Sequence, residues 1–373
     1  MSSDKKKVLH LAHEMGVGGT QQVIRQLVGS LDTTRFECSV ACIDGMIGMI
    51  GEELQHNGLE FHVFDRQPGF DRQLIRDIRQ VLLSESIDIV HCHQYTPYTY
   101  GVLAALFTDV KVVFTEHGRF YPDSYSWKRR LINPLLQHRT DSIVAISAAT
   151  ADALAEYEWF TRRSIDVIYN GTDVEEPEGD SSAREELQIP AESLVFGTIA
   201  RFDPIKNLPM MINGFREVHQ RLPDTRLLMV GDGEEREALE ALVKEAGLKD
   251  SVLFTGYQSD TARYMSAIDV YLLTSFSEGT SMTLLEAMAT RKPPIVTAVG
   301  GNIEIVEHLK NGLVVDSGDT ERLVSHMNEL VEDKQQRVQL GNAARDEYEK
   351  RFSVSSMTEQ YEAVYKRCLK IAA

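Results

Sequence analysis

The chain has 373 residues, of which 43% are hydrophobic and 25% charged, enough for two globular domains of about 100–200 residues each. Its 39 basic and 56 acidic residues give a net charge of -17. Nucleic acid is therefore not an expected partner, because binding to backbone phosphates requires a basic face. A local basic site for one small anion is still compatible with this charge.

The cysteines and the lengths of the apolar runs indicate the cellular compartment in which the protein is expected. Neither a disulfide scaffold nor zinc or redox spacing is formed by the four cysteines, Cys38, Cys42, Cys92 and Cys368. The apolar run that follows MSSDKKK is too short for a signal peptide. No stretch approaches the about 20 apolar residues that a membrane span needs. We expect free thiols and a cytoplasmic protein, with contact to a membrane surface left open.

The first half of the chain alternates short β-rich runs with helical segments. A buried strand at 7–13 precedes a glycine-containing loop at 15–20 and an amphipathic helix at 21–31. Further strands are expected at 36–43, 61–64, 88–93, 111–117, 142–147 and 165–170, with helices between them, for example at 71–85. Strands that are apolar on both faces and separated by helices indicate a parallel sheet covered on both sides.

A change of composition marks the middle of the chain. Residues 172–188 are acidic and polar, contain Pro177 and Gly179, and are expected to link two domains. The alternation then resumes, with strands expected at 194–200, 226–231, 252–256, 269–275, 294–298 and 312–315, and a long helical tail over 319–371. Two repeats of one βα pattern predict an α/β protein of two doubly wound parallel-sheet domains. Ligands of such sheets bind beyond the carboxyl ends of the strands, so one is expected between the domains.

Segment 275–296 carries two carboxylates around a helix start. Glu278 lies in a loop after an expected strand, and Glu286 lies one turn into the next helix. Residues 279–281 form a small-residue turn at the helix N-terminus, where unpaired N–H groups suit a phosphate. Because carboxylates accept hydrogen bonds from sugar hydroxyls, the pattern describes a site for a diphosphate flanked by hydroxylated groups. A serine-capped helix with acidic residues near its N-terminus is the structural alternative.

Segment 197–215 carries two cations. Arg201 follows an expected strand, and Lys206 comes five residues later, just before a helix. Both are expected at the carboxyl edge of the sheet, where an Arg fork and a compact Lys charge can clamp phosphate oxygens. Two solvated loop cations would explain this segment equally simply when it is taken alone.

Together these segments resemble the retaining GT-B glycosyltransferases of family 4, which include many bacterial polysaccharide and lipopolysaccharide transferases. The matching motifs are RFDPIKN at 201–207, GDG at 231–233, SEGTSMTLLEAMA at 277–289, NGTD at 170–173 and TEHG at 115–118. The resemblance covers nearly the whole chain and implies two Rossmann-like domains that face each other across a cleft. It implies an N-terminal acceptor-binding domain at 1–172 and a C-terminal nucleotide-sugar donor domain at 190–350. A C-terminal helix at 351–373 is expected to pack back on the N-terminal domain.

The resemblance implies roles for residues of the second domain. Arg201 and Lys206 would hold the donor diphosphate and neutralise the leaving nucleotide as the glycosidic bond breaks. Glu286 would bind the ribose hydroxyls, and Glu278 would bind hydroxyls of the donor sugar. Backbone N–H groups would assist with the diphosphate at Gly279, Thr280 and Ser281.

It also implies roles in the first domain. His117 would lie beneath the sugar as a further catalytic residue, although a structural histidine at a strand end is the alternative. Gly18 and Gly19 would let the first loop approach the donor closely, since glycine has no Cβ. Many family members have Glu two residues after this glycine pair, on the acceptor side. Gln21 occupies that place here, so the chain departs from the pattern at acceptor binding.

The implied function is transfer of a sugar, with retention of configuration, from a nucleotide sugar to a hydroxyl of a surface polysaccharide or lipid-linked glycan. UDP is the expected nucleotide, with GDP and ADP as alternatives. The chain has no D-x-D motif, and neither a metal nor another cofactor is expected. Family members use front-face attack, so Glu278 is not expected to be a covalent nucleophile. A nucleotide-sugar epimerase and a non-catalytic nucleotide-sugar-binding module are the alternative functions.

Segment 124–139 combines basic and apolar residues. It contains Trp127, Lys128, Arg129, Arg130, Leu131, Ile132, Leu135 and Leu136. Two hypotheses follow. The segment either makes peripheral contact with anionic lipids of the inner membrane surface, or it is an amphipathic helix buried on its own sheet.

Overall fold

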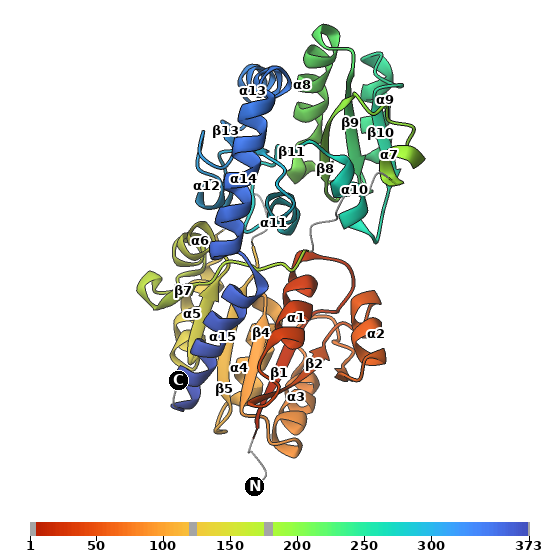
Figure 1. Ribbon diagram of the computed structural model, residues 1–373. Helices are drawn as coiled ribbons and strands as arrows, with labels where there is room; N and C mark the ends of the chain where they lie inside the picture. Colours follow the sequence, from red (N-terminus) through yellow and green to blue (C-terminus); the bar gives the residue numbers. More distant parts are fainter. Residues whose placement is uncertain (1–4, 119–124, 175–181, 372–373) are drawn as a thin grey trace. The chain divides into compact units, whose positions relative to one another are not determined.

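The computed structural model describes residues 5–118, 125–174 and 182–371. The chain divides into two compact units, an N-terminal unit of residues 1–171 with 354–373, and a C-terminal unit of residues 172–353. Each unit is a parallel β-sheet covered by helices on both faces (Figure 1). The predicted fold class, two doubly wound α/β domains, is confirmed.

In the described part of the N-terminal unit, seven parallel strands lie in the order β3-β2-β1-β4-β5-β6-β7. The strands are β1 (Lys6–Ala12), β2 (Phe36–Cys42), β3 (Glu60–Val63), β4 (Ile89–His93), β5 (Lys111–Glu116), β6 (Ser142–Ala145) and β7 (Ile165–Val167). The helices are α1 (Gly19–Ser30), α2 (Met49–His56), α3 (Arg72–Ser84), α4 (Tyr95–Ala105), α5 (Trp127–His138), α6 (Ala148–Glu158), the short η1 (Arg162–Ser164) and α15 (Val354–Leu369). The strand order reverses between β1 and β4, the position where such sheets bind ligands.

The described part of the C-terminal unit repeats this topology in the order β10-β9-β8-β11-β12-β13. The strands are β8 (Leu194–Ile199), β9 (Thr225–Val230), β10 (Val252–Gly256), β11 (Val270–Leu273), β12 (Pro294–Thr297) and β13 (Leu313–Val315). The helices are α7 (Ser182–Glu186), η2 (Pro204–Lys206), α8 (Leu208–Arg221), α9 (Arg236–Glu245), α10 (Thr261–Ala267), α11 (Met282–Ala289), α12 (Asn302–Ile305), α13 (Thr320–Glu332) and α14 (Lys334–Arg351). The reversal here falls between β8 and β11.

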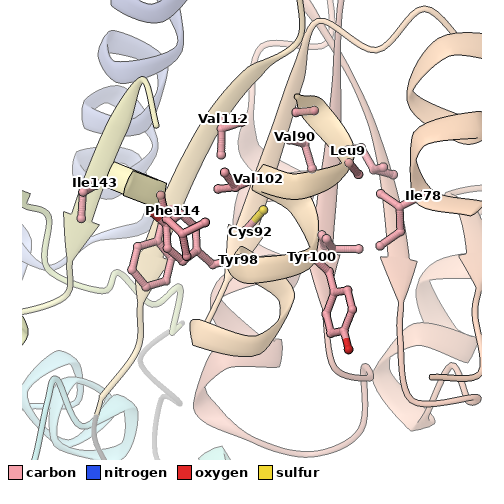
Figure 2. Close-up of a cluster of buried hydrophobic side chains, with 14 of the residues drawn as sticks. Leu9, Ile78, Val90, Cys92, Tyr98, Tyr100, Val102, Val112, Phe114 and Ile143 are labelled. Carbon is pink, nitrogen blue, oxygen red and sulfur yellow. The ribbon is translucent and has the colours of Figure 1, made fainter. Parts of the chain in front are cut away.

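The two faces of the N-terminal sheet differ in chemistry. On one face α3 and α4 cover an apolar core, in which the rings of Tyr98 and Phe114 stack with centroids 4.0 Å apart (Figure 2). Val90 and Cys92 of β4 point into this core. Since side chains alternate along a strand, the intervening His91 belongs to the opposite face, which is covered in part by α15.

The structure subdivides two of the expected segments. The tail expected over 319–371 is helical and consists of three helices, α13, α14 and α15, of which the last belongs to the N-terminal unit. The linker expected over 172–188 includes helix α7, whose Arg184 pairs with Asp269 of the C-terminal unit at 2.7 Å. Residues 175–181 of that stretch lie outside the described residues.

All four cysteines are free thiols, as expected. Cys42, Cys92 and Cys368 are buried, and Cys38 is half-buried. Burial raises the pKa of the Cys42 thiol to about 12, so this thiol is protonated and unreactive at neutral pH.

Candidate active site

Two loops emerge where the strand order of the C-terminal sheet reverses. The loop after β8 carries Arg201 and Lys206, and the loop after β11 carries Glu278. Since β8 and β11 are parallel neighbours, both loops leave the sheet at its carboxyl edge. The cations and the carboxylate that were predicted from separate sequence segments therefore share one site.

Lys206 and Glu278 form an ion pair across this site. The Lys206 Nζ atom lies 2.7 Å from Glu278 Oε1, and only 9% of the Glu278 side chain is exposed. The Ser275 hydroxyl donates to the same carboxylate oxygen at 2.6 Å. Glu278 is thus held in one orientation by a charge and a hydroxyl. A carboxylate held in this way is better suited to accept hydrogen bonds from sugar hydroxyls than to act as a nucleophile.

Arg201 is held more loosely. Its guanidinium pairs with Asp203 at 2.6 Å, and 78% of its side chain is exposed. Asp203 also caps the η2 turn by accepting a hydrogen bond from the Ile205 N–H. An exposed guanidinium on a capped turn can rotate onto a bound phosphate without breaking the fold.

The GDG motif holds the Arg201 loop. A Cβ atom at Gly231 would lie 1.9 Å from the Ala200 carbonyl oxygen, and one at Gly233 would lie 2.4 Å from that of Phe202. Between them, the Asp232 carbonyl accepts a hydrogen bond from the Phe202 N–H at 2.8 Å. These glycines allow two backbones to touch, and the motif therefore positions a neighbouring loop.

A second glycine contact, which the sequence did not reveal, holds the Glu278 loop. Gly300 has φ +48, and a Cβ atom there would lie 2.0 Å from the Glu278 carbonyl oxygen. The next residue, Gly301, donates its N–H to this oxygen at 3.0 Å. The loop after β12 therefore positions the loop after β11.

Helix α11 follows the Glu278 loop. Ser281 is its N-cap and accepts from the Leu284 N–H, and Gly279 and Thr280 precede this cap. Glu286 lies on the first turns of the helix, where burial raises its pKa to about 7. The negative charges of Glu278 and Glu286 contribute to raising the pKa of the Tyr271 hydroxyl, after the larger effect of burial. Both carboxylates thus lie near one buried tyrosine.

The N-terminal unit holds the remaining predicted residues. Gly18 and Gly19 open helix α1, and Gln21 lies on its first turn. The Gln21 amide donates to both the backbone carbonyl and the carboxylate of Glu14, each at 3.2 Å. Glu14, which was not predicted, places a carboxylate beside the position where many family members carry Glu.

His117 follows β5 and is part of a histidine cluster. Its Nε2 atom lies 2.8 Å from His93 Nδ1, and His93 Nε2 lies 3.1 Å from His10 Nδ1. His91 is hydrogen-bonded instead to Tyr365 and Thr115, at 2.7 and 2.8 Å. The cluster was not predicted, and the sequence carries one signal for it: His91 and His93 occupy alternate positions of IVHCH and therefore lie on one face of β4.

The hydrogen bonds of this histidine cluster do not favour metal binding. Nitrogens of His10, His91 and His93 lie within 4.8 Å of one another. However, both nitrogens of His91, both of His93 and the Nδ1 of His10 already take part in hydrogen bonds. A metal ion would have to replace these hydrogen bonds, so the cluster fits a hydrogen-bond network better than a ligand set.

The chain is similar to known glycosyltransferases along most of its length. Residues 17–176 match the model described as Glycosyltransferase Family 4, and residues 180–347 match Glycosyl transferases group 1. N-acetyl-alpha-D-glucosaminyl L-malate synthase of Bacillus anthracis is 27% identical over 313 residues, 82% of this chain and 81% of that protein. UDP-Gal:alpha-D-GlcNAc-diphosphoundecaprenol alpha-1,3-galactosyltransferase of Escherichia coli is 25% identical over 351 residues, 88% and 89% of the two chains.

A solved structure shares the fold. HepE of Anabaena, in complex with UDP, has a TM-score of 0.85 at 24% identity, over 96% of this chain and 98% of that one. Two doubly wound units with these motifs define a glycosyltransferase enzyme of the GT-B fold. The chain belongs to glycosyltransferase family 4. An epimerase and a non-catalytic binding module are therefore set aside.

Proposed function

We propose that this enzyme transfers a sugar from a UDP-sugar to an acceptor hydroxyl of a surface polysaccharide or a lipid-linked glycan, with retention of configuration. The observation that carries this proposal is the Lys206–Glu278 pair at the reversal point of the C-terminal sheet. The Escherichia coli relative, a transferase with a UDP-sugar donor and a diphosphoundecaprenol acceptor, supports it. The UDP complex of Anabaena HepE supports the choice of nucleotide.

The proposed mechanism uses electrostatics and position. Arg201 and Lys206 bind the diphosphate and stabilise the negative charge that develops on it as the sugar leaves. Glu286 binds the ribose, and Glu278 binds sugar hydroxyls. The departing phosphate oxygen accepts the acceptor proton on the same face, so no covalent enzyme intermediate forms. We propose that the two cations replace a metal ion in this role, and that transfer persists in EDTA.

The ribose role of Glu286 predicts a pH-dependent affinity for the donor. Because its pKa is about 7 in the free protein, the accepting carboxylate is depleted below that pH. We expect a nucleotide sugar to bind about tenfold more weakly at pH 6 than at pH 8. UDP-glucose is the probe, since its diphosphate does not titrate in this range. Calorimetry at the two pH values measures the difference.

Matched variants complete this experiment. Glu286→Gln should abolish both the binding and its pH dependence, whereas Glu245→Gln, an exposed carboxylate on α9, should change neither. The folded-state pKa of Glu286 exceeds its usual value, so ionisation at pH 8 opposes folding and Glu286→Gln should raise the Tm of the free protein. Arg201→Ala should leave that Tm unchanged and weaken UDP-glucose binding. Unaltered binding in both site variants would show that the donor site lies elsewhere.

We also propose that helix α5 contacts the cytoplasmic face of an anionic membrane. Four large apolar side chains of α5 are between 46% and 72% exposed: Trp127, Leu131, Ile132 and Leu135. Lys128 and Arg130 are exposed beside them, whereas Arg129 pairs with Glu158. Exposure of this apolar face argues against a helix buried on its own sheet. Within the described ranges, none of the helices has the length and apolar composition needed to cross a membrane.

Vesicle binding tests this contact. The chain has two tryptophans, so Trp159→Phe leaves Trp127 as the only one, and its emission should shift to the blue with phosphatidylglycerol vesicles. Lys128→Glu with Arg130→Glu should weaken binding at least about tenfold. The same charge change at exposed Lys244 and Lys249 is the control. Absence of binding by the parent, or equal loss in both double variants, would contradict the proposal.

A further inference from the structure

The most exposed large hydrophobic side chain among the described residues is that of Phe107. It lies in the turn between α4 and β5, and 85% of it is exposed to solvent. A single exposed apolar side chain is ordinary on a protein surface. The meaning of Phe107 therefore depends on how the turn holds it and on which side chains lie beside it.

The turn holds Phe107 through hydrogen bonds on both sides. On its N-terminal side, the Arg79 guanidinium of α3 donates to the Leu106 carbonyl oxygen. On its C-terminal side, the Thr108 hydroxyl donates to the Ala105 carbonyl oxygen at 2.8 Å. The backbone of Phe107 has φ +61, a left-handed conformation that glycine adopts without a steric cost. Since glycine would fit this turn better, the stability of the turn does not explain a phenylalanine here.

Phe107 is continuous with the exposed apolar face of α5. The guanidinium of Arg139, the C-cap residue of α5, lies 6.0 Å from the centre of the Phe107 ring. Arg139 follows Trp127, Leu131 and Leu135 at intervals of four residues, and side chains at this spacing are neighbours on one face of a helix. These three apolar side chains are 70%, 63% and 72% exposed. The exposed surface of α5 therefore continues through Arg139 to Phe107.

The chemistry of this surface fits an anionic membrane. Besides its apolar side chains it carries Lys128, Arg130 and Arg139, all exposed, and residues 127–138 of α5 include no Asp or Glu. Basic side chains are attracted to anionic head groups, while aromatic and leucine side chains are buried at the boundary between head groups and acyl chains. Arg139 can keep its guanidinium among the phosphates while the Phe107 ring beside it lies deeper.

We propose that Phe107 inserts into the membrane that α5 contacts, as a second anchor on a separate element. The inference rests on the proposed function, in which α5 binds an anionic membrane, and adds the turn to that contact. A helix that lies on a membrane can rotate about its own axis, and an anchored turn beside its end restricts this rotation. The carboxyl edge of the N-terminal sheet is then held at a fixed angle to the bilayer, which positions it for a lipid-linked acceptor.

Phe107→Gly removes the ring without straining the turn, and Leu309→Gly is its matched control. Leu309 is 60% exposed and has φ +64, but it lies in a turn of the C-terminal unit outside this surface. Cosedimentation of the full-length proteins with vesicles of phosphatidylglycerol and phosphatidylcholine measures binding. We expect Phe107→Gly to weaken binding about tenfold and Leu309→Gly to leave it unchanged. Neither should lower the Tm, because glycine adopts a positive φ without strain. Equal binding by the parent and Phe107→Gly would contradict the proposal.

Salt separates the contribution of the ring from that of the charges. The attraction of Lys128 and Arg130 to anionic lipid is screened by salt, whereas the burial of an apolar ring is not. The ratio of parent binding to Phe107→Gly binding should therefore be the same at about 0.1 M and about 0.3 M salt. The effect of Lys128→Glu with Arg130→Glu should become smaller over the same range. A ratio that falls to one at the higher salt would show that the ring does not insert.

A tryptophan probe measures insertion directly. After Trp127→Phe and Trp159→Phe, the substitution Phe107→Trp places the only tryptophan of the chain in the turn. Its emission should shift to the blue on vesicles and be quenched by brominated acyl chains. Leu309→Trp in the same background should show neither change. A blue shift at both positions would show adsorption without a preferred surface and would contradict the proposal.

The remaining outcomes distinguish this inference from the proposals on which it rests. If the chain binds vesicles while the emission of Phe107→Trp stays unshifted, the turn remains in water and only this inference fails. If the parent chain does not bind vesicles, the contact of α5 and the insertion of Phe107 both fail. Neither measurement requires sugar transfer, so a chain that binds vesicles through Phe107 but transfers no sugar would refute the proposed reaction alone.

Discussion

Replacing Lys206 with Met is expected to abolish sugar transfer and also to destabilise the C-terminal unit. The loss of transfer, at least about 100-fold in kcat, follows from removing the charge that stabilises the leaving diphosphate in the proposed mechanism. The loss of stability has a separate cause. Glu278 is 9% exposed, and without the Lys206 ammonium the Ser275 hydroxyl is the one remaining hydrogen-bond donor to its carboxylate among the described residues.

The size of the stability loss can be bounded. Removing one partner of a fully buried pair costs about 3–5 kcal/mol, but 21% of the Lys206 side chain is exposed, so solvent weakens the effect. A cost of about 2 kcal/mol would lower the Tm by roughly 4–8 °C for a unit of this size. Thermal melting of Lys206→Met beside Lys244→Met, an exposed lysine of α9, measures this loss.

The double variant separates catalysis from stability. Adding Glu278→Gln to Lys206→Met removes the uncompensated carboxylate while keeping an oxygen for the Ser275 hydroxyl. The Tm should therefore recover most of its loss, whereas transfer should stay absent. Recovery of transfer together with the Tm would mean that Lys206 serves only the fold. A Tm unchanged in the single variant would mean that the pair is too solvated to matter.

The sequence predicted the parts of this site that depend on regular alternation. Strands recur with helices between them, and parallel strands bring their carboxyl ends to one edge, so Arg201, Lys206 and Glu278 could be assigned to one site before any coordinates. The pairing of Lys206 with Glu278 was not predictable, because it depends on how two loops fold toward each other. The contact of Gly300 with Glu278 was hidden for the same reason.

In the N-terminal unit, prediction from the sequence was limited for a different reason. His10 and His93 looked like ordinary strand residues, since neither belongs to a motif that the resemblance supplied. Their contact follows from the register of β1 and β4, in which His10 is paired with His91. His93 lies two residues further along β4 and therefore on the same face of the sheet. Helix α5 illustrates the converse, because its composition allowed both a buried and an exposed apolar face. Only tertiary packing distinguishes these two arrangements.

Gly300→Ala is expected to impair transfer through backbone contact alone. The new methyl carbon would lie 2.0 Å from the Glu278 carbonyl oxygen, so one of the two loops must move by about 1 Å to restore van der Waals distance. A displacement of that size at a catalytic group costs about 100-fold in rate. Steady-state kinetics of sugar transfer, together with thermal melting, measure both consequences.

Gly318→Ala is the matched control for this change. Gly318 also has a positive φ, +88, but a Cβ atom there would meet nothing within 4 Å. Both substitutions carry the cost of a left-handed backbone at a non-glycine residue, about 1–2 kcal/mol. Only Gly300→Ala adds the collision with Glu278, so the difference between the two variants isolates the positioning of that loop. If both variants lose stability alone and keep the kcat of the wild type, the loop after β12 does not position Glu278 for transfer.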